Sequence, residues 1–295
     1  MSQDAPAPHS MVEPALGEAA AFVERTLDAL LPKPAGPEIR LAAAMREAAL
    51  GPDHRLRAFL VLQAGRLFRV DRRALARAAA AVECVHAYGL AHAFQTAQGG
   101  PAQGEENISL YNVFDESIAI LAGDALLTFA FGLLGSADGI GDPFTRAELV
   151  TRLAQATGHA GMIGGRALEV AFAAAATAPP LPEISRLQHM KTAALITFCC
   201  EAGAILGRAS PPARHALSAY GQDVGLVFQI ASDLAASSDE PVDTHKTTVV
   251  GALGVDRAHA QALALSEQAV RHLDLFDEKA DLLRAAATFI LARQA

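Results

Sequence analysis

Apolar residues recur at spacings of three and four along nearly the whole chain, beginning with Val12, Leu16, Ala20, Val23, Leu27 and Leu31. This spacing places them on one face of an α-helix. The same pattern predicts further helices at residues 37–50, 55–68, 72–93, 114–134, 146–176, 183–207, 213–234, 256–276 and 278–293. Alternation of period two nowhere persists for six residues, which argues against a doubly wound sheet. We therefore predict an all-α protein.

Proline and glycine separate these segments, and small residues recur inside them. Glycines stand at helical positions such as Gly123, Gly158, Gly161, Gly203 and Gly207, which favours close helix packing around a long central space. No linker is long enough to separate two domains. We expect one domain over residues 1–295, with about the first eleven residues frayed.

Charge and cysteine content exclude several classes of protein. The chain has 24 Lys and Arg against 32 Asp and Glu, a net charge of −8, so it has no cationic excess for nucleic acid. Three cysteines, two of them adjacent, cannot form a disulfide framework and indicate a reducing compartment, the cytoplasm. Neither a secretory signal nor a continuous apolar stretch of about eighteen residues is present, so we expect no transmembrane segment.

Six landmarks follow one another in a fixed order. They are Arg55-Leu-Arg57, VECVHAYGLAH at residues 82–92, AILAGDAL at 119–126, GMIGG at 161–165 with Ala167-Leu168, Lys191-Thr192, and YGQDVGLVFQIASD at 220–233. Over roughly residues 40 to 290 this order resembles the trans-isoprenyl diphosphate synthases of the farnesyl and geranylgeranyl type. The resemblance implies an isoprenoid-synthase-type helical bundle around a central cavity, a prenyl diphosphate ligand and a homodimer.

The family's two aspartate-rich metal motifs are degraded in this chain. The resemblance implies that DDxxD helices hold three magnesium ions, because carboxylates four residues apart share one helix face. After His92 the chain reads AFQTAQGGPAQGEE, with no carboxylate at a first-motif position and the family's arginine pair replaced by Gly104 and Glu105. The second motif reads SDLAA, with Asp233 as its only acid. We predict no metal site, and magnesium as a cofactor only if the protein is an active enzyme.

The cationic residues of the family's site are better retained. The resemblance places Arg55 and Arg57 at the homoallylic diphosphate, with His54 at the preceding lysine position, and Lys191 and Lys246 at the allylic diphosphate. Thr192 and Gln229 are also retained, which completes the set of candidate substrate-binding residues. Guanidinium groups bind phosphate oxygens in pairs. The alternative is that Arg55 and Arg57 are solvent-facing helix charges.

Other candidate sites have simpler explanations. Cys84, His86 and His92 lack a fourth ligand at zinc spacing and are interpreted as core or cavity-lining residues. Arg166 either changes the polarity of the cavity wall or pairs with a neighbouring acid. Tyr88 indicates a short cavity or serves in packing.

Three functions follow from these observations. The first is a prenyl-diphosphate-binding paralogue or subunit impaired in metal-dependent condensation, as a homodimer or a heterodimer with an active homologue. The second is an active prenyltransferase that joins isopentenyl diphosphate to an allylic diphosphate and makes a short-chain product. The third is a structural interaction protein with an unused cavity. Loss of metal ligands favours the first, because metal clamps supply several kcal/mol of transition-state stabilisation.

Overall fold

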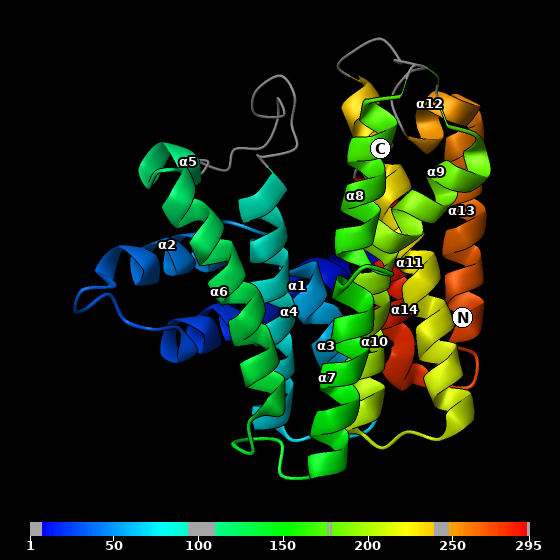
Figure 1. Cartoon of the computed structure of the whole chain (residues 1–295). Coiled ribbons are helices and arrows are strands. Elements are labelled where there is room, and N and C mark those ends of the chain that lie inside the picture. The colour runs from blue at the N-terminus through cyan, green and yellow to red at the C-terminus, as the bar shows by residue number, and fades with distance from the viewer. Residues whose placement is uncertain (1–7, 94–109, 176, 178, 239–247, 294–295) are drawn as a thin grey trace. The chain divides into compact units, whose positions relative to one another are not determined.

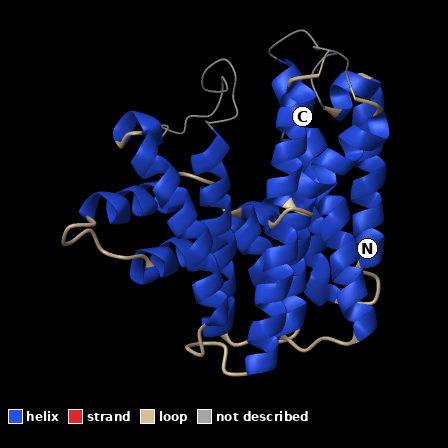
Figure 2. Ribbon diagram, in the orientation of Figure 1, coloured by secondary structure: helices blue, strands red, loops and turns tan. Residues whose placement is uncertain are grey.

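A computed structural model describes residues 8–93, 110–175, 177, 179–238 and 248–293. Within these ranges every regular element is helical and no strand is present (Figure 2), which confirms the predicted all-α class. The chain groups into two compact units. The α4 unit, named after helix α4 (Arg72–Ala93), comprises residues 16–62 and 71–150, and the α11 unit, named after helix α11 (Pro211–Ser238), comprises residues 1–15, 63–70 and 151–295. The single domain expected from the sequence stays a prediction.

The remaining elements are labelled in Figure 1. They are α1 (Pro8–Leu30), α2 (Ile39–Leu50), α3 (Leu56–Arg66), α5 (Leu110–Val113), α6 (Glu116–Gly135), α7 (Pro143–Thr157), α8 (Met162–Ala173), α9 (Leu181–Gln188), a π-helical turn η2 (His189–Ala193), α10 (Ala194–Leu206), α12 (Val249–Leu253), α13 (Val255–His272), a 3₁₀ turn η3 (Glu278–Ala280) and α14 (Asp281–Arg293).

The core of the α4 unit lies between α4 and α6, and α2 packs against both. Residues 78–82 of α4, four alanines and a valine, are completely buried. Small side chains let the two helix backbones approach closely. At Gly123 of α6, a Cβ would lie only 2.4 Å from the His92 ring, so a larger residue there would displace the histidine. Asp115 caps α6 by accepting a hydrogen bond from the Ile118 N–H at 3.0 Å.

The α11 unit is built around its longest helix. Helix α11 packs against α10, α13, α14 and η2. Tyr220 of α11 is completely buried, and its hydroxyl donates to the Leu283 carbonyl of α14 at 2.6 Å. The buried hydroxyl is therefore satisfied, as burial of a polar group requires.

Two predicted helices differ from the structure. The single helix predicted at residues 146–176 is wrong, because α7 ends at Thr157 and α8 begins at Met162. Glycines fill this break, where a Cβ at Gly161 would lie 2.1 Å from the Ala156 carbonyl oxygen. The helix predicted at 183–207 runs as α9, η2 and α10, with a π-helical turn at Lys191 and Thr192. Periodicity does not distinguish such a turn from the surrounding α-helix.

Helix α6 is the one described helix that is long and apolar enough to cross a membrane, by length and composition alone. Its Ala119, Ala122 and Leu126 are completely buried, and the helix packs against α4 and α2. Buried core helices share this composition, so the expected lack of a transmembrane segment stays a prediction.

Candidate functional site

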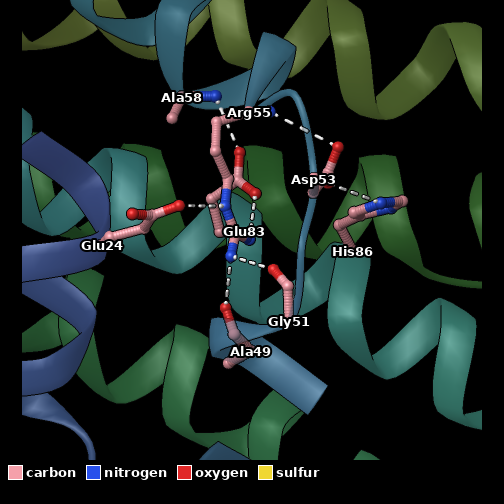
Figure 3. A network of polar contacts seen from close by, with 8 residues as sticks. All are labelled: Glu24, Ala49, Gly51, Asp53, Arg55, Ala58, Glu83 and His86. Atoms are coloured by element: carbon pink, nitrogen blue, oxygen red, sulfur yellow. Dashed lines mark hydrogen bonds and ion pairs between the residues drawn. The ribbon is translucent and has the colours of Figure 1, made fainter. Parts of the chain in front are cut away.

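The connection between α2 and α3 carries the first group of predicted substrate-binding residues (Figure 3). Arg55 is only 2% exposed. Its Nη1 donates to Glu83 Oε2 at 3.1 Å, and its Nη2 donates to the carbonyls of Ala49 and Gly51 at 2.9 and 2.8 Å. Its Nε lies 3.9 Å from a carboxylate oxygen of Glu24. The guanidinium is thus bound within the α4 unit.

Glu83 of α4 is the partner that fixes this connection. Its side chain is completely buried, and its second oxygen accepts a hydrogen bond from the Ala58 N–H at 2.9 Å. That N–H belongs to the first turn of α3, where backbone donors lack partners within the helix. Glu83 therefore both neutralises the charge of Arg55 and caps α3. The backbone of Arg55 adopts a φ of 53°, in the left-handed region.

His86 lies one turn after Glu83 on α4 and faces Asp53 (Figure 3). Its Nε2 lies 3.1 Å from Asp53 Oδ2, and both side chains are about one fifth exposed, at 20% and 23%. Burial alone would raise the pKa of Asp53, but its contact with His86 and the charges of Arg57 and Arg55 outweigh burial and hold that pKa well below its usual value. Arg57 is half-buried and His54 is exposed.

The second group lies in the α11 unit, where η2 carries Lys191 and Thr192. Two glycines allow this turn to pack closely. A Cβ at Gly165 of α8 would lie 2.5 Å from the Lys191 backbone nitrogen, and one at Gly225 of α11 would lie 2.5 Å from the Ala193 Cα. The backbone of η2 is therefore packed closely on two sides, at Lys191 and at Ala193, and π-helical turns are frequent at functional sites.

Asp233 of α11 is held by a chain of amide and hydroxyl groups. Gln229 Nε2 donates to Asp233 Oδ1 at 2.9 Å, and Gln188 Nε2 donates to Oδ2 at 3.0 Å. The Thr192 hydroxyl donates to the Gln229 amide oxygen at 2.7 Å, which orients that amide. Burial raises the pKa of Asp233 to about 6, against the lowering effects of Gln229, Lys191 and Gln188.

Lys191 forms an ion pair beside this chain of hydrogen bonds. Its Nζ lies 2.7 Å from Glu169 Oε1, and the other oxygen of Glu169 pairs with Arg166. Burial alone would raise the pKa of Glu169, and these two cations lower it below its usual value. Of the two interpretations of Arg166, pairing with a neighbouring acid is the one that this contact supports.

The residues around Asp233 do not fit a magnesium site. Each carboxylate oxygen accepts a hydrogen bond from an amide N–H, and an N–H group cannot serve as a cation ligand. Among the described residues, no group of three or more His, Cys, Asp or Glu side chains could hold a metal ion. His92 instead lies 3.5 Å from Asp124, and its ring contacts that of Tyr88 in a tilted arrangement, with an interplanar angle of 52° and ring centroids 4.7 Å apart.

The structure thus describes the predicted site residues as two groups, one within each unit. Arg55 and Arg57 belong to the α4 unit. The α11 unit brings Lys191, Thr192, Gln229 and Asp233 together. Lys246 and residues 94–109, where the resemblance places the first aspartate motif, lie outside the described residues.

Sequence reasoning missed three residues that organise these groups. They are Asp53, Glu83 and Gln188. Glu83 carried a usable signal, because it is the one acid in the otherwise uncharged run from Ala78 to Gly104, and a carboxylate in a buried helix needs a cationic partner. Gln188 carried none, because helix α9 presents no other feature that distinguishes it.

Comparisons with known proteins agree with the six landmarks. Residues 106–270 match the family model described as polyprenyl synthetase. The chain is 34% identical over 270 residues to farnesyl diphosphate synthase of Escherichia coli, and the alignment covers 84% of this chain and 88% of that protein. It is 31% identical over 266 residues to geranylgeranyl diphosphate synthase of Pantoea ananas, covering 88% and 84%. The apo structure of an FPP/GFPP synthase from Zymomonas mobilis matches with a TM-score of 0.87 and 40% identity, covering 95% and 98% of the two chains. The chain therefore belongs to the polyprenyl synthetase family.

Proposed function

We propose that this protein binds prenyl diphosphates but is impaired in metal-dependent condensation, and acts as a non-catalytic paralogue or subunit. One observation carries the proposal: both oxygens of Asp233, the one acid left in the second metal motif, accept hydrogen bonds from glutamine amides. Each oxygen of this carboxylate is thus already engaged by an N–H donor. It is a poor ligand for magnesium, which needs anionic anchors and keeps several waters.

The missing ligands carry a large kinetic cost. Metal ions on a leaving phosphate supply several kcal/mol of transition-state stabilisation, and about 1.4 kcal/mol corresponds to a factor of ten in rate. Losing nearly all the carboxylates of the two motifs removes most of that stabilisation. We therefore expect the condensation rate to fall by several orders of magnitude relative to a homologue that has both motifs.

Diphosphate binding depends on the retained cations and hydrogen-bonding groups. The Lys191 ammonium has three N–H donors, and its contact with Glu169 uses one of them. In this proposal Lys191 and Lys246 bind the allylic diphosphate, Thr192 and Gln229 orient the residues around it, and Arg57 contacts the second diphosphate. Arg55 acts by holding the connection that carries Arg57.

A product assay tests the impairment directly. The purified protein is incubated with magnesium, isopentenyl diphosphate and a panel of allylic diphosphates, with E. coli farnesyl diphosphate synthase as the reference. We expect prenyl product at less than about a thousandth of the reference rate, in line with the loss of several kcal/mol. Product near the reference rate would contradict the proposal. Binding of geranyl diphosphate, measured by calorimetry with Lys191→Met as the control, tests the retained ligand site.

The names of the relatives favour a second candidate, an active prenyltransferase that joins isopentenyl diphosphate to an allylic diphosphate with a short-chain product. In that case Asp233 is the remaining metal ligand and Asp233→Ala abolishes turnover. Turnover that is present and unchanged in Asp233→Ala would remove Asp233 from any metal-dependent mechanism.

We also propose that α6 carries a dimer surface. Leu121 is 51% exposed, and Ala125, Thr128 and Gly132 follow it at helical spacing on the same face. A face of small and apolar residues permits close packing of a second copy or an active homologue. Light scattering tests this, because Leu121→Arg should yield monomers, whereas Leu263→Arg, at a 47% exposed position of α13, should not. Co-purification with an active homologue tests the heterodimer.

A reducing compartment, the cytoplasm, completes the proposal. Cys84, Cys199 and Cys200 are all buried, and none forms a disulfide. Burial also raises the pKa of the Cys200 thiol well above its usual value, which makes it unreactive. Buried thiols of this kind are compatible with a protein that is never oxidised.

A further inference from the structure

Gln188, the last residue of α9, has a buried polar atom without a hydrogen-bond partner. The residue is only 2% exposed, and its Nε2 donates to Asp233 Oδ2 at 3.0 Å. Its amide oxygen Oε1 is also buried, and no described residue donates to it. A buried acceptor nearly always has a donor, and one without a donor is destabilising. The amide oxygen therefore indicates that a positively charged or donating group would be stabilised beside Asp233.

The two glutamines that contact Asp233 differ in how firmly their amides are oriented. The amide oxygen of Gln229 accepts a hydrogen bond from the Thr192 hydroxyl at 2.7 Å, so its N–H group is directed at Asp233. The amide oxygen of Gln188 makes no such bond. Only the contact with Asp233 orients this amide, and an oxygen at its position is a ligand type that hard cations accept. The Gln188 side of Asp233 is therefore the adaptable side.

The charges around Asp233 nevertheless disfavour a divalent cation. Burial raises the pKa of Asp233 to about 6, so at pH 7.5 it carries one negative charge. Lys191 acts on Asp233 electrostatically, and Glu169 pairs with both Lys191 and Arg166. The two cations and the two carboxylates of this cluster cancel in net charge. A divalent cation needs more than one anionic anchor, so charge excludes it from this position.

We propose that Gln188 is the specificity-determining residue that keeps divalent cations away from Asp233, because it supplies a neutral amide where a carboxylate would complete a cation site. Glutamate has nearly the same shape as glutamine, so exchanging the amide nitrogen for oxygen would place a second carboxylate against Asp233. Two adjacent carboxylates repel unless a proton or a cation lies between them. This inference rests on the proposed function, in which the Asp233 position does not bind a divalent cation, and it names the residue responsible.

Manganese binding tests the inference on the full-length protein at pH 7.5, without any diphosphate. Free Mn²⁺ is measured by electron paramagnetic resonance, because Mn²⁺ is a hard cation with the same preference for oxygen ligands. We expect Gln188→Glu to bind Mn²⁺ at least about tenfold more tightly than the unsubstituted protein, a change of about 1.4 kcal/mol. Gln268→Glu is the matched control, because it adds the same charge to the same unit at an exposed position of α13, and its affinity should not change.

A double variant locates the gain in affinity. Gln188→Glu combined with Asp233→Asn should return to the affinity of the unsubstituted protein, with circular dichroism confirming that each variant folds. Equal affinity of Gln188→Glu and the unsubstituted protein, including no detectable binding by either, would overturn the inference. A gain that survives Asp233→Asn would overturn its location. Failure of Gln188→Glu to fold even with Mn²⁺ present would also overturn it, because the cation should neutralise the added acid. The proposed function is judged separately, by the product assay and geranyl diphosphate binding of the unsubstituted protein.

Discussion

Replacing Arg55 with methionine removes a guanidinium that is 2% exposed while leaving most of the volume of its side chain. The carboxylate of Glu83 then stays completely buried with the Ala58 N–H as its one remaining partner from this network. The carbonyls of Ala49 and Gly51 lose the donor that Arg55 supplied. The variant therefore leaves the buried Glu83 carboxylate without its cationic partner and two backbone carbonyls without the donor from Arg55.

The expected loss in free energy of unfolding follows from that geometry. Removing one partner of a buried ion pair costs about 3–5 kcal/mol, because the other charge stays desolvated. This is a large part of the roughly 5–15 kcal/mol that stabilises a typical folded protein. With a urea dependence of about 3 kcal/mol per M, appropriate for a chain of this size, the unfolding midpoint should fall by about 1 M or more.

Urea unfolding followed by circular dichroism measures the change, and a double-mutant cycle identifies its cause. Glu83→Gln alone should also destabilise, because it leaves the Arg55 charge unpaired. The double variant Arg55→Met with Glu83→Gln should lose at least about 1 kcal/mol less than the sum of the single losses. Arg57→Met, at a half-buried position two residues away, should cost less than half as much as Arg55→Met.

One result would refute this reasoning. If Arg55→Met unfolds within about 0.3 M urea of the unsubstituted protein, a shift too small for a broken buried pair, and instead abolishes pyrophosphate binding, then Arg55 is a ligand for diphosphate. The buried ion pair with Glu83 would then contribute little to stability.

Two further changes test the α11 unit. The pKa of Asp233 is raised from 3.8 to about 6 in the folded state, so the folded protein binds this proton more tightly, and its stability falls as pH rises from about 4 to about 6. Asp233→Asn should therefore be about 2 kcal/mol more stable than the unsubstituted protein at pH 7.5, a value discounted for partial exposure, and should show no such gain at pH 4, as measured by urea unfolding. A gain that is independent of pH would contradict the assigned pKa. Gly165→Ala should cost roughly 1–3 kcal/mol, because its Cβ would lie 2.5 Å from the Lys191 nitrogen. Gly17→Ala in α1, with no atom within 4 Å of its Cβ, should stabilise by up to about 1 kcal/mol, and equal losses in both variants would show that packing at Lys191 is not the cause.

Much of the fold follows from local sequence pattern. The spacing of apolar residues predicts α4 with its observed bounds, residues 72–93, because a helical period depends only on neighbours within two turns. The sequence also contains Gly158 and Gly161, but interpreting them as packing residues predicts one continuous helix at 146–176, where the structure has α7 and α8. A glycine that permits close packing and one that ends a helix are identical until the backbone around them is known.

The roles of Arg55 and Arg57 depended on the tertiary structure. The sequence contains two arginines two residues apart and does not distinguish between them as diphosphate ligands. The resemblance assigns both to the same diphosphate. The structure separates them, because Glu83, 28 residues further along the chain, reaches one of them inside the core. The same holds for Asp53 and His86, and for Asp233 and Gln188, which lie 45 residues apart. Composition and periodicity determine which segments are helices, whereas the burial and the partner of each charge are set by contacts between distant segments, which only the folded chain brings together.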